Sequence, residues 1–234
     1  MPISKIRQRL QRLADRNTAV VLQRFFKTGP GEYGEGDVFI GIKVPPLRKL
    51  AAEFEGEPLQ AIRTLLKSKI HEERVLALMI LARRFARENE QGRRQIYNLY
   101  LAHVRFINNW DLVDGSAPYI VGAFLSSRSR RPLYVLAKST SLWKRRIAIL
   151  ATFHFIRQND FTDALRISEL LLRDEHDLIH KAVGWMLREI WKRHPTTGEA
   201  FLKKHHRTMP RTMLRYAIER LPESRRKKVL LGNW

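Results

Sequence analysis

The sequence predicts an all-α protein, built as a solenoid in which pairs of helices stack one after another. Apolar residues recur at helical spacing from one end of the chain to the other. No stretch shows the alternating, β-branched pattern of a strand bounded by turn residues. Similar segments also return along the chain at a nearly constant interval, which is typical of repeat proteins made of paired helices.

The repeat is defined by short segments that mix basic and apolar residues. The run 74–79 resembles the run 145–150, which begins 71 residues later, and the run 181–186 begins 36 residues after that. The first interval is about twice the second, so one unit spans about 35 to 36 residues. We therefore expect a right-handed solenoid of HEAT-like antiparallel helix pairs with a concave basic face. In this register Trp110, Arg146 and Trp185 occupy corresponding places and should converge on one surface.

The individual helices follow from apolar stripes and from helix-start signals. Residues 1–13 interleave basic residues with apolar ones, which predicts an amphipathic helix. Three further stripes predict buried helix faces around 75–86, 147–155 and 182–190. Proline is favoured in the first turn of a helix, so starts are expected at Pro45–Pro46, Pro58, Pro132, Pro195, Pro210 and Pro222. The whole chain, 1–234, is expected to form one repeat domain, capped by the helices of residues 1–56.

Residues 28–37 form the one long irregular stretch. Gly29, Gly31 and Gly34 within it have the spacing of the dinucleotide-binding fingerprint. That motif needs a strand before it and a helix that opens at its last glycine, whereas here a helix precedes it. We interpret the segment as a surface loop between two N-terminal helices.

The charge of the chain restricts its partners. It has 44 Lys and Arg against 23 Asp and Glu, a formal net charge of +21. Nucleic acid, an anionic membrane surface or an acidic protein would fit such a surface. Arginine clusters recur along the whole sequence, which predicts a charged face on a folded body rather than a basic tail.

Several classes of function find no support. The chain has no cysteine, which excludes disulfides, thiolate zinc sites and cysteine nucleophiles. No apolar run approaches the roughly 18 to 20 residues of a membrane span, and there is no signal peptide, so we expect a soluble, cytoplasmic monomer. His176 and His180 are four apart but lack a third ligand, so neither a metal nor a cofactor is expected.

The run 109–114 contains the most informative pair of residues. Trp110 and Asp114 are four residues apart and therefore share a helix face. A carboxylate inside a strongly basic surface opposes phosphate binding and so suggests another task. The alternative is that Trp110 belongs to the core and Asp114 is a cap or an ion-pair partner. Asp111 could add a second carboxylate, but it shares only part of that face, so one of the two acids is expected to point inward.

Four segments, in the same order, resemble the AlkD family of DNA alkylation repair glycosylases. They are 39–48, 110–114, 143–150 and 181–189, and the likeness extends from about Phe25 to Ala217. The resemblance implies a HEAT-like solenoid that holds duplex DNA and excises N3- and N7-alkylated purines by hydrolysis of the N-glycosidic bond, without a base-flipping pocket.

The resemblance also implies roles for single residues. Asp114 would be the catalytic carboxylate, and Trp110 and Trp185 would be aromatic walls beside the damaged nucleotide. Arg146 would hold a backbone phosphate near the lesion, with further DNA contacts by Phe25, Lys43, Arg145, Lys181 and Arg188. Two positions depart from the family pattern, because Phe25 stands where a tyrosine is expected and His154 where a lysine is typical.

Elementary chemistry agrees with these roles. A 7-alkylpurine already carries positive charge, so it can leave without a general acid. A carboxylate near the sugar stabilises the developing oxocarbenium charge and can place a water molecule. Indole faces attract cations, and the always-charged Arg146 suits a phosphate. Two other functions stay open: a non-catalytic HEAT protein that binds bent or branched DNA, and a solenoid that binds an acidic protein.

Overall fold

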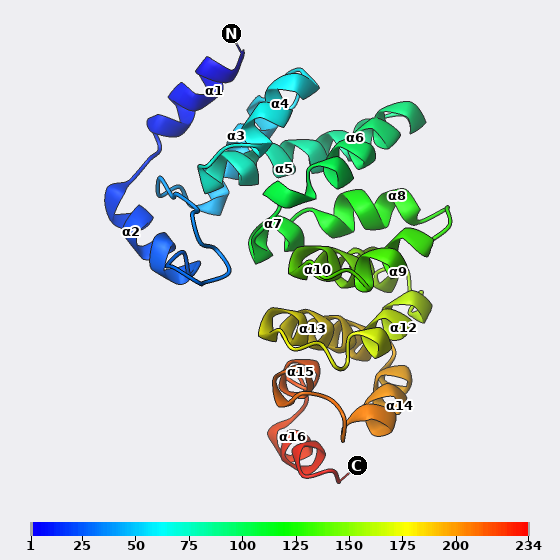
Figure 1. Cartoon of the computed structure of the whole chain (residues 1–234). Coiled ribbons are helices and arrows are strands. Elements are labelled where there is room, and N and C mark those ends of the chain that lie inside the picture. The colour runs from blue at the N-terminus through cyan, green and yellow to red at the C-terminus, as the bar shows by residue number, and fades with distance from the viewer. Residues whose placement is uncertain (1, 234) are drawn as a thin grey trace. The chain divides into compact units, whose positions relative to one another are not determined.

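The computed structural model describes residues 2–233, and its regular elements in this range are helices (Figure 1). The only β-bridge among these residues is an isolated parallel one between Val38 and Ile70. The predicted all-α fold is thus confirmed. Backbone contacts divide the chain into two compact units, residues 1–120 and 121–234, here called unit 1 and unit 2. The expectation of a single repeat domain with a concave basic face stays a prediction.

Unit 1 is organised around its longest helix, α5, which packs against α3, α4, α6 and α7. Leu76, Ile80 and Leu81 of α5 are completely buried and form the centre of the core. Helix α1, at the N-terminus of this unit, packs against α4. The helices of unit 1 are α1 (Pro2–Gln11), α2 (Arg16–Phe25), α3 (Val44–Glu53), α4 (Leu59–Leu66), α5 (His71–Arg87), α6 (Glu90–Ala102), the 3-10 turn η1 (Val104–Phe106) and α7 (Trp110–Asp114).

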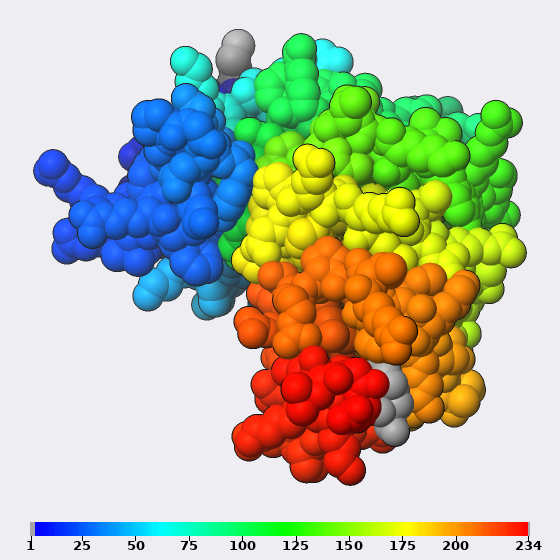
Figure 2. Space-filling model, turned by 60° about the horizontal axis from the view of Figure 1, so that its bottom comes forward, coloured from blue at the N-terminus to red at the C-terminus, as the bar shows by residue number. Residues whose placement is uncertain are grey.

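Unit 2 is organised around α13 in the same way. Helix α13 packs against α10, α14 and α15. The segments of unit 2 that are coloured yellow, orange and red in Figure 2 lie as successive layers. A π-helical turn, η2 (Pro118–Gly122), spans the boundary between the two units. The helices of unit 2 are α8 (Ala123–Leu125), α9 (Arg131–Ala137), α10 (Leu142–Ala151), α11 (Phe153–Ile156), α12 (Thr162–Leu170), α13 (Asp177–Arg193), α14 (Pro195–His205), α15 (Arg211–Ala217) and α16 (Glu223–Leu230).

The expected helix starts and apolar stripes are confirmed. Proline lies at or next to the first residue of each helix for which it was expected: α3, α4, α9, α14, α15 and α16. In α1 the stripe residues Ile6 and Leu10 are buried. One stripe is shorter than expected, because Ala86 is exposed in the last turn of α5.

The repeat register is visible in a recurring contact. Arg74 and Arg145 are each the fourth residue of a helix, and each donates to a carbonyl six residues earlier, at 3.2 Å and 3.0 Å. The prediction that Trp110, Arg146 and Trp185 occupy corresponding places in their helices was wrong, however. Trp110 is the first residue of α7, Arg146 the fifth of α10 and Trp185 the ninth of α13. For Trp110 the reason is that α7 begins late, after the turn η1, and the convergence of the three residues on one surface stays a prediction.

Candidate nucleic-acid site at the start of helix α7

Helix α7 is short, and side chains fix where it begins. The Asn109 side chain accepts a hydrogen bond from Trp110 N at 2.8 Å, and Asp111 Oδ1 accepts one from Leu112 N at 2.9 Å. Such bonds satisfy backbone donors that a helix start leaves unpaired. Trp110 and Asp114 then stand at the two ends of this single turn, four residues apart as predicted.

The indole of Trp110 is held by a column of aromatic rings. Trp110 stacks on Phe26 with centroids 5.0 Å apart and planes at 13°. Phe26 stacks on Phe39 at 5.0 Å, and Phe39 on the ring of His71 at 4.4 Å. Phe25 approaches Trp110 edge-on at 5.9 Å and is 61% exposed. Each such ring pair stabilises the fold by about 0.5 to 1.5 kcal/mol beyond burial, so the indole has a defined orientation.

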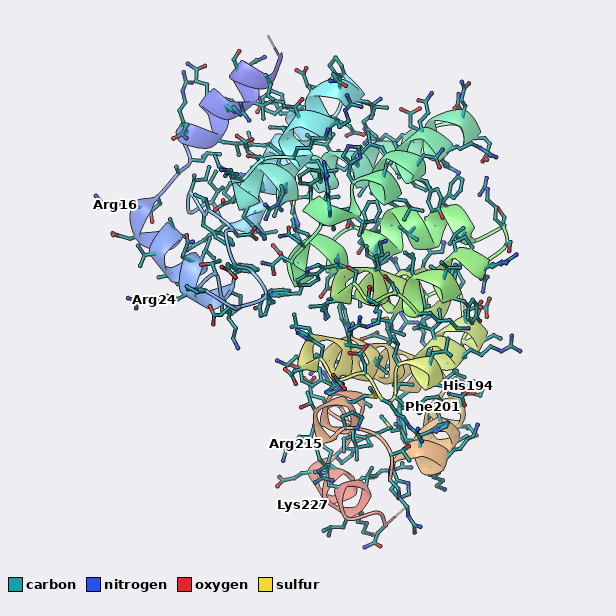
Figure 3. All side chains as sticks on the ribbon, in the orientation of Figure 1. Arg16, Arg24, His194, Phe201, Arg215 and Lys227 are labelled. Atoms are coloured by element: carbon teal, nitrogen blue, oxygen red, sulfur yellow. The ribbon has the colours of Figure 1, made fainter. Side chains whose placement is uncertain are left out.

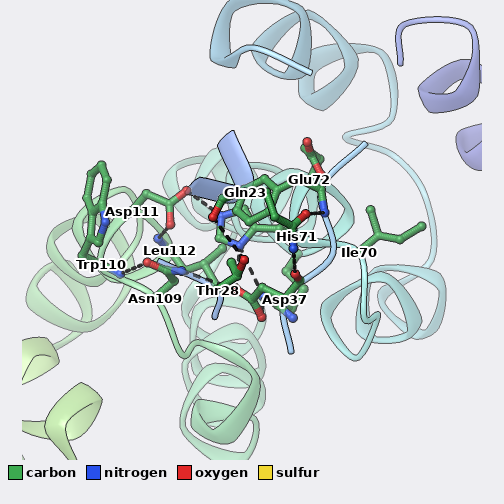
Figure 4. A network of polar contacts seen from close by, with 12 residues as sticks. Gln23, Thr28, Asp37, Ile70, His71, Glu72, Asn109, Trp110, Asp111 and Leu112 are labelled. Atoms are coloured by element: carbon green, nitrogen blue, oxygen red, sulfur yellow. Dashed lines mark hydrogen bonds and ion pairs between the residues drawn. The ribbon is translucent and has the colours of Figure 1, made fainter. Parts of the chain in front are cut away.

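A buried polar network lies at the other end of this column (Figure 4). Asp37 is its centre: Oδ1 pairs with Arg74 Nη2 at 2.6 Å, and Oδ2 pairs with His71 Nδ1 at 3.0 Å. The second ring nitrogen of His71, Nε2, lies 2.8 Å from Asp111 Oδ2. Asn109 Nδ2 reaches Asp37 Oδ2 at 3.4 Å. The network therefore joins the loop before α3 to α5 and to the start of α7.

The loop before α3 is shaped to deliver Asp37. Gln23 Nε2 of α2 donates to the Asp37 carbonyl at 2.8 Å. A Cβ at Gly34 would lie 2.6 Å from the Phe26 carbonyl oxygen, so only glycine fits there without displacement. The expectation of a surface loop was thus wrong for part of the segment, because Gly34 and Asp37 are buried. Their burial results from the contact that the loop makes with the α7 start.

Two neighbouring glutamates anchor the same region. The carboxylate of Glu72 accepts hydrogen bonds from the backbone N–H groups of residues 40, 41 and 42, the closest at 2.8 Å. Glu73 receives a bidentate pair from Arg7 of α1, at 2.9 Å and 3.0 Å. The first four residues of α5, His71 to Arg74, are therefore all charged or polar and all buried.

The charge states follow from the contacts. Burial raises the pKa of Asp37, but hydrogen bonds from His71 and the charge of Arg74 outweigh it, and the pKa is lowered. Burial lowers the pKa of His71, but hydrogen bonds to Asp111 and Asp37 outweigh it, and the pKa is raised. The contacts of His71 with Asp37 and Asp111 thus favour the imidazolium form of its ring.

Asp114 lines an open pocket of about 430 Å³. Ala51, Met79 and Ala82 give it an apolar floor, and Arg48, Arg83, Gly115 and Tyr119 line the rest. Arg83 also pairs with Glu55 at 2.9 Å. The lining thus combines an apolar surface, two guanidinium groups and the Asp114 carboxylate. Asp111, by contrast, points inward to His71.

The remaining predicted residue of unit 1 is Lys43, and helix α2 adds further exposed cations. Lys43 is exposed and immediately precedes α3. Arg16 and Arg24 of α2 point away from the body of the unit (Figure 3) and form no ion pair within residues 2–233. Val21 of the same helix is 65% exposed. This face combines cations with apolar side chains beside Phe25.

The candidates of unit 2 are engaged within the protein. Arg145 Nε pairs with Asp174 at 2.5 Å, Lys181 with Asp177 at 2.6 Å, and Arg188 with Glu219. Arg146 is 4% exposed and donates to the Leu178 carbonyl. Trp185 is half-buried and lies 5.8 Å from the Phe153 ring. Grouping these five with Trp110 and Asp114 in one site stays a prediction.

His154 is the second position that departs from the family pattern. Its side chain is half-buried, and burial lowers its pKa.

Sequence reasoning missed the residues beneath Trp110. Asp37, His71, Arg74 and the inward role of Asp111 were not expected, and Phe26 and Phe39 were not recognised as a stack. One signal was available: a run of four charged or polar residues, 71–74, directly precedes the apolar stripe of α5. A buried face that begins with charges requires buried partners.

Comparison with known families now identifies the chain. A model of the family described as DNA alkylation repair enzyme matches residues 6–221, which is most of the sequence. The chain belongs to the DNA alkylation repair enzyme family. No curated protein matches its sequence significantly.

Solved structures show the same fold for this DNA alkylation repair family member. A protein described as a predicted DNA alkylation repair enzyme from Enterococcus faecalis superposes with a TM-score of 0.69 at 18% identity, over 90% of this chain and 97% of that one. AlkD2 from Streptococcus mutans superposes with a TM-score of 0.53 at 17% identity, over 88% and 98%. Within residues 2–233, no helix is long and apolar enough to cross a membrane.

Proposed function

We propose that this DNA alkylation repair protein is a glycosylase that releases cationic N3- and N7-alkylated purines from duplex DNA. The observation that carries the proposal is the pair at α7. The Trp110 indole is oriented by Phe26, and one turn later the Asp114 carboxylate lines a pocket that Arg48 and Arg83 also line. An oriented aromatic face and a carboxylate at an open surface are what a cationic lesion and its charged sugar require.

The reaction needs few groups from the protein. The bond between C1′ and N9 of the alkylated purine breaks, and its electron pair neutralises the positive base. Positive charge develops on the sugar, where the Asp114 carboxylate stabilises it. A water molecule attacks C1′, and its proton passes to the carboxylate and then to solvent. No general acid takes part, because the leaving group is cationic from the start.

Duplex binding is supported by charge and by exposed cations. The net charge of +21 favours the phosphate backbone. Arg16 and Arg24 point to solvent on unit 1, as Arg215 and Lys227 do on unit 2 (Figure 3). Trp185, Arg146, Arg188, Arg145 and Lys181 are proposed to add contacts from unit 2. A phosphate contact by Arg146 requires its buried guanidinium to become accessible.

A second function is DNA binding without base excision. It differs from the first in whether the Asp114 carboxylate can reach the sugar of a bound nucleotide. Binding to a protein partner is the third possibility, and it needs neither the oriented indole nor a carboxylate in a pocket.

One assay separates the three functions. The protein in excess is incubated with a duplex that contains a single 7-methylguanine, and with matched duplexes that contain uracil or hypoxanthine. A glycosylase of the proposed kind releases 7-methylguanine and leaves the neutral bases in place. Binding without release supports the non-catalytic function. In parallel, the association constant for duplex DNA is measured at several salt concentrations. The slope of its logarithm against the logarithm of the salt concentration should be about −0.9 per neutralised phosphate, whereas a flat response would favour a protein partner.

A further inference from the structure

His71 is buried at the base of the aromatic column and contacts a carboxylate on each side. The side chain of His71 is 2% exposed, and that of Asp37 is 3% exposed. Asp111 is the one carboxylate of this network that reaches solvent, with 22% of its side chain exposed. The imidazole therefore connects a buried acid to an acid at the start of α7, next to Trp110 (Figure 4).

Both ring nitrogens of His71 must carry a proton. An ionised carboxylate can only accept hydrogen bonds, and one lies 3.0 Å from Nδ1 and another 2.8 Å from Nε2. Arg74 Nη2 also lies 3.3 Å from Nδ1. It is closer to Asp37 Oδ1, at 2.6 Å, and its proton belongs there. An unprotonated Nδ1 would direct its lone pair at Asp37 Oδ2, which is repulsive.

The charged groups around the ring balance one another. The loop before α3 contributes Asp37, α5 contributes Arg74, and α7 contributes Asp111, so two acids face two bases. The adjacent Glu72 and Glu73 direct their carboxylates elsewhere, to backbone N–H groups and to Arg7. The faces of the ring meet Phe39 and Phe26. An uncharged imidazole would leave this site with an excess negative charge.

We propose that His71 is a positioning residue for base excision: its imidazolium holds Asp111, and thereby fixes the first turn of α7 that presents Trp110 and Asp114. This inference rests on the proposed function only for its effect on excision. The link between the His71 proton and the Trp110 ring belongs to the fold of unit 1 and can be measured without a substrate.

Loss of one proton would release α7. A neutral imidazole has a single N–H donor, so one of its two carboxylate bonds must break. Asp37 stays fixed by Arg74 and Asn109, whereas Asp111 can turn to solvent. The bond to Asp111 is therefore the one that breaks. Because the pKa of His71 is raised, the ordered state of Trp110 should be complete below about pH 6.5 and should be lost as pH rises through the raised pKa.

Nuclear magnetic resonance of the full chain tests the link directly. With 15N-labelled histidine, His71 should show two protected ring N–H signals at pH 7, assigned by their loss in His71→Gln. The indole N–H signal of Trp110, assigned with Trp110→Phe, should shift with the same alkaline midpoint as the His71 ring. In Asp111→Asn both midpoints should move to lower pH together. The control His176→Gln, at a helix start of unit 2, should leave the Trp110 signal and its midpoint unchanged.

Excision provides the second measurement. Misplacing a reacting group by about 1 Å can slow a reaction by roughly a hundredfold. Asp111→Asn should therefore lower the single-turnover rate on 7-methylguanine by about tenfold to a hundredfold, change the duplex dissociation constant by less than about twofold, and shift the alkaline limb of the rate profile.

The outcomes separate the two proposals. A single ring N–H on His71 at pH 7, or a Trp110 signal that ignores the His71 midpoint, overturns the positioning role even if the protein excises bases. A linked titration in a protein that releases no 7-methylguanine retains the His71–Trp110 link and rejects the glycosylase. If His71→Gln fails to fold, Asp111→Asn, whose side chain keeps its shape, still decides the question.

Discussion

Arg74 in unit 1 and Arg145 in unit 2 occupy the same place in their repeats, but their partners differ. Each guanidinium binds a carbonyl six residues earlier and a carboxylate that is almost fully buried. In unit 2 that carboxylate, Asp174, otherwise accepts a hydrogen bond from one backbone N–H, that of residue 176. In unit 1 it is Asp37, which also binds the side chains of His71 and Asn109. The arginine–carboxylate pair is therefore a structural feature of the repeat, and the additional contacts belong to unit 1.

The pKa values of the histidines next to the two pairs are shifted in opposite directions. His176 caps α13 by accepting the backbone N–H of Leu178 at 3.1 Å, and burial together with Arg145 lowers its pKa. A neutral ring is expected there, because the positive end of a helix disfavours a cation. His71 is the first residue of α5, yet its pKa is raised by Asp111 and Asp37. The carboxylates of Asp111 and Asp37 thus outweigh the unfavourable effect of the helix N-terminus on a cation, which indicates a role of His71 beyond packing.

The largest expected effect is on stability. Asp37→Asn should lower the free energy of unfolding by about 3 to 5 kcal/mol, because it leaves Arg74 and His71 buried without an anion. Asp174→Asn removes a carboxylate from one guanidinium only, and Arg145 keeps two carbonyl contacts. We expect it to cost less than Asp37→Asn. Urea midpoints of both variants measure the difference, and equal losses would show that the network of unit 1 adds nothing to the repeat.

The next effect concerns catalysis. Asp114→Asn should slow release of 7-methylguanine by about 10²- to 10³-fold, the usual cost of losing one group that stabilises charge in a transition state. Duplex affinity should be retained or should rise slightly, because a negative charge is removed from a basic surface. The matched control is Glu175→Gln, which removes an exposed carboxylate from unit 2. Wild-type single-turnover rates in Asp114→Asn would exclude the carboxylate from the reaction.

The third prediction compares the two histidines by pH. The pKa of His71 is raised, so its contribution to stability is complete below about pH 6.5 and is lost as pH rises through the raised value. The pKa of His176 is lowered, so its contribution is complete above about pH 6.5 and is lost as pH falls through the lowered value. The free energy of unfolding is measured from pH 5 to 9 for wild type, His71→Gln and His176→Gln. The difference between wild type and variant, plotted against pH, should have opposite slopes for the two histidines. Slopes of the same sign would contradict the contrast between the units.

The helices of the fold were predictable because their signals are local. Proline at the starts and apolar residues at helical spacing determine which segments form helices and which faces become buried. The recurrence of Arg74 and Arg145 was also visible as a repeat. The register of Trp110 was not, because the turn η1 inserts residues before α7 and moves the start of that helix.

The site was predictable only at its surface. Trp110 and Asp114 stand out as an unusual pair within a few residues. Asp37, His71 and Asp111 lie 34 and 40 residues apart along the chain, and they meet because the glycine-rich loop and α7 both pack against the start of α5. No local pattern reveals such a meeting. Only the run of buried charges at 71–74 indicated that partners had to exist.

The smallest expected effect separates the two tryptophans. Trp110 stacks at 13° on Phe26, whereas Trp185 meets Phe153 at 45° with centroids 5.8 Å apart. Replacing either indole by alanine removes a cation–π contact of about 0.5 to 2 kcal/mol if the ring faces the lesion, a loss of about twofold to thirtyfold in rate. Because its ring is held in one orientation, we expect Trp110→Ala to show the larger loss, and Trp110→Phe to recover part of it. Rates for 7-methylguanine release decide this, with duplex affinity as the control. A larger loss in Trp185→Ala would assign the principal aromatic wall to unit 2, and the aromatic column of unit 1 would then serve the fold rather than the reaction.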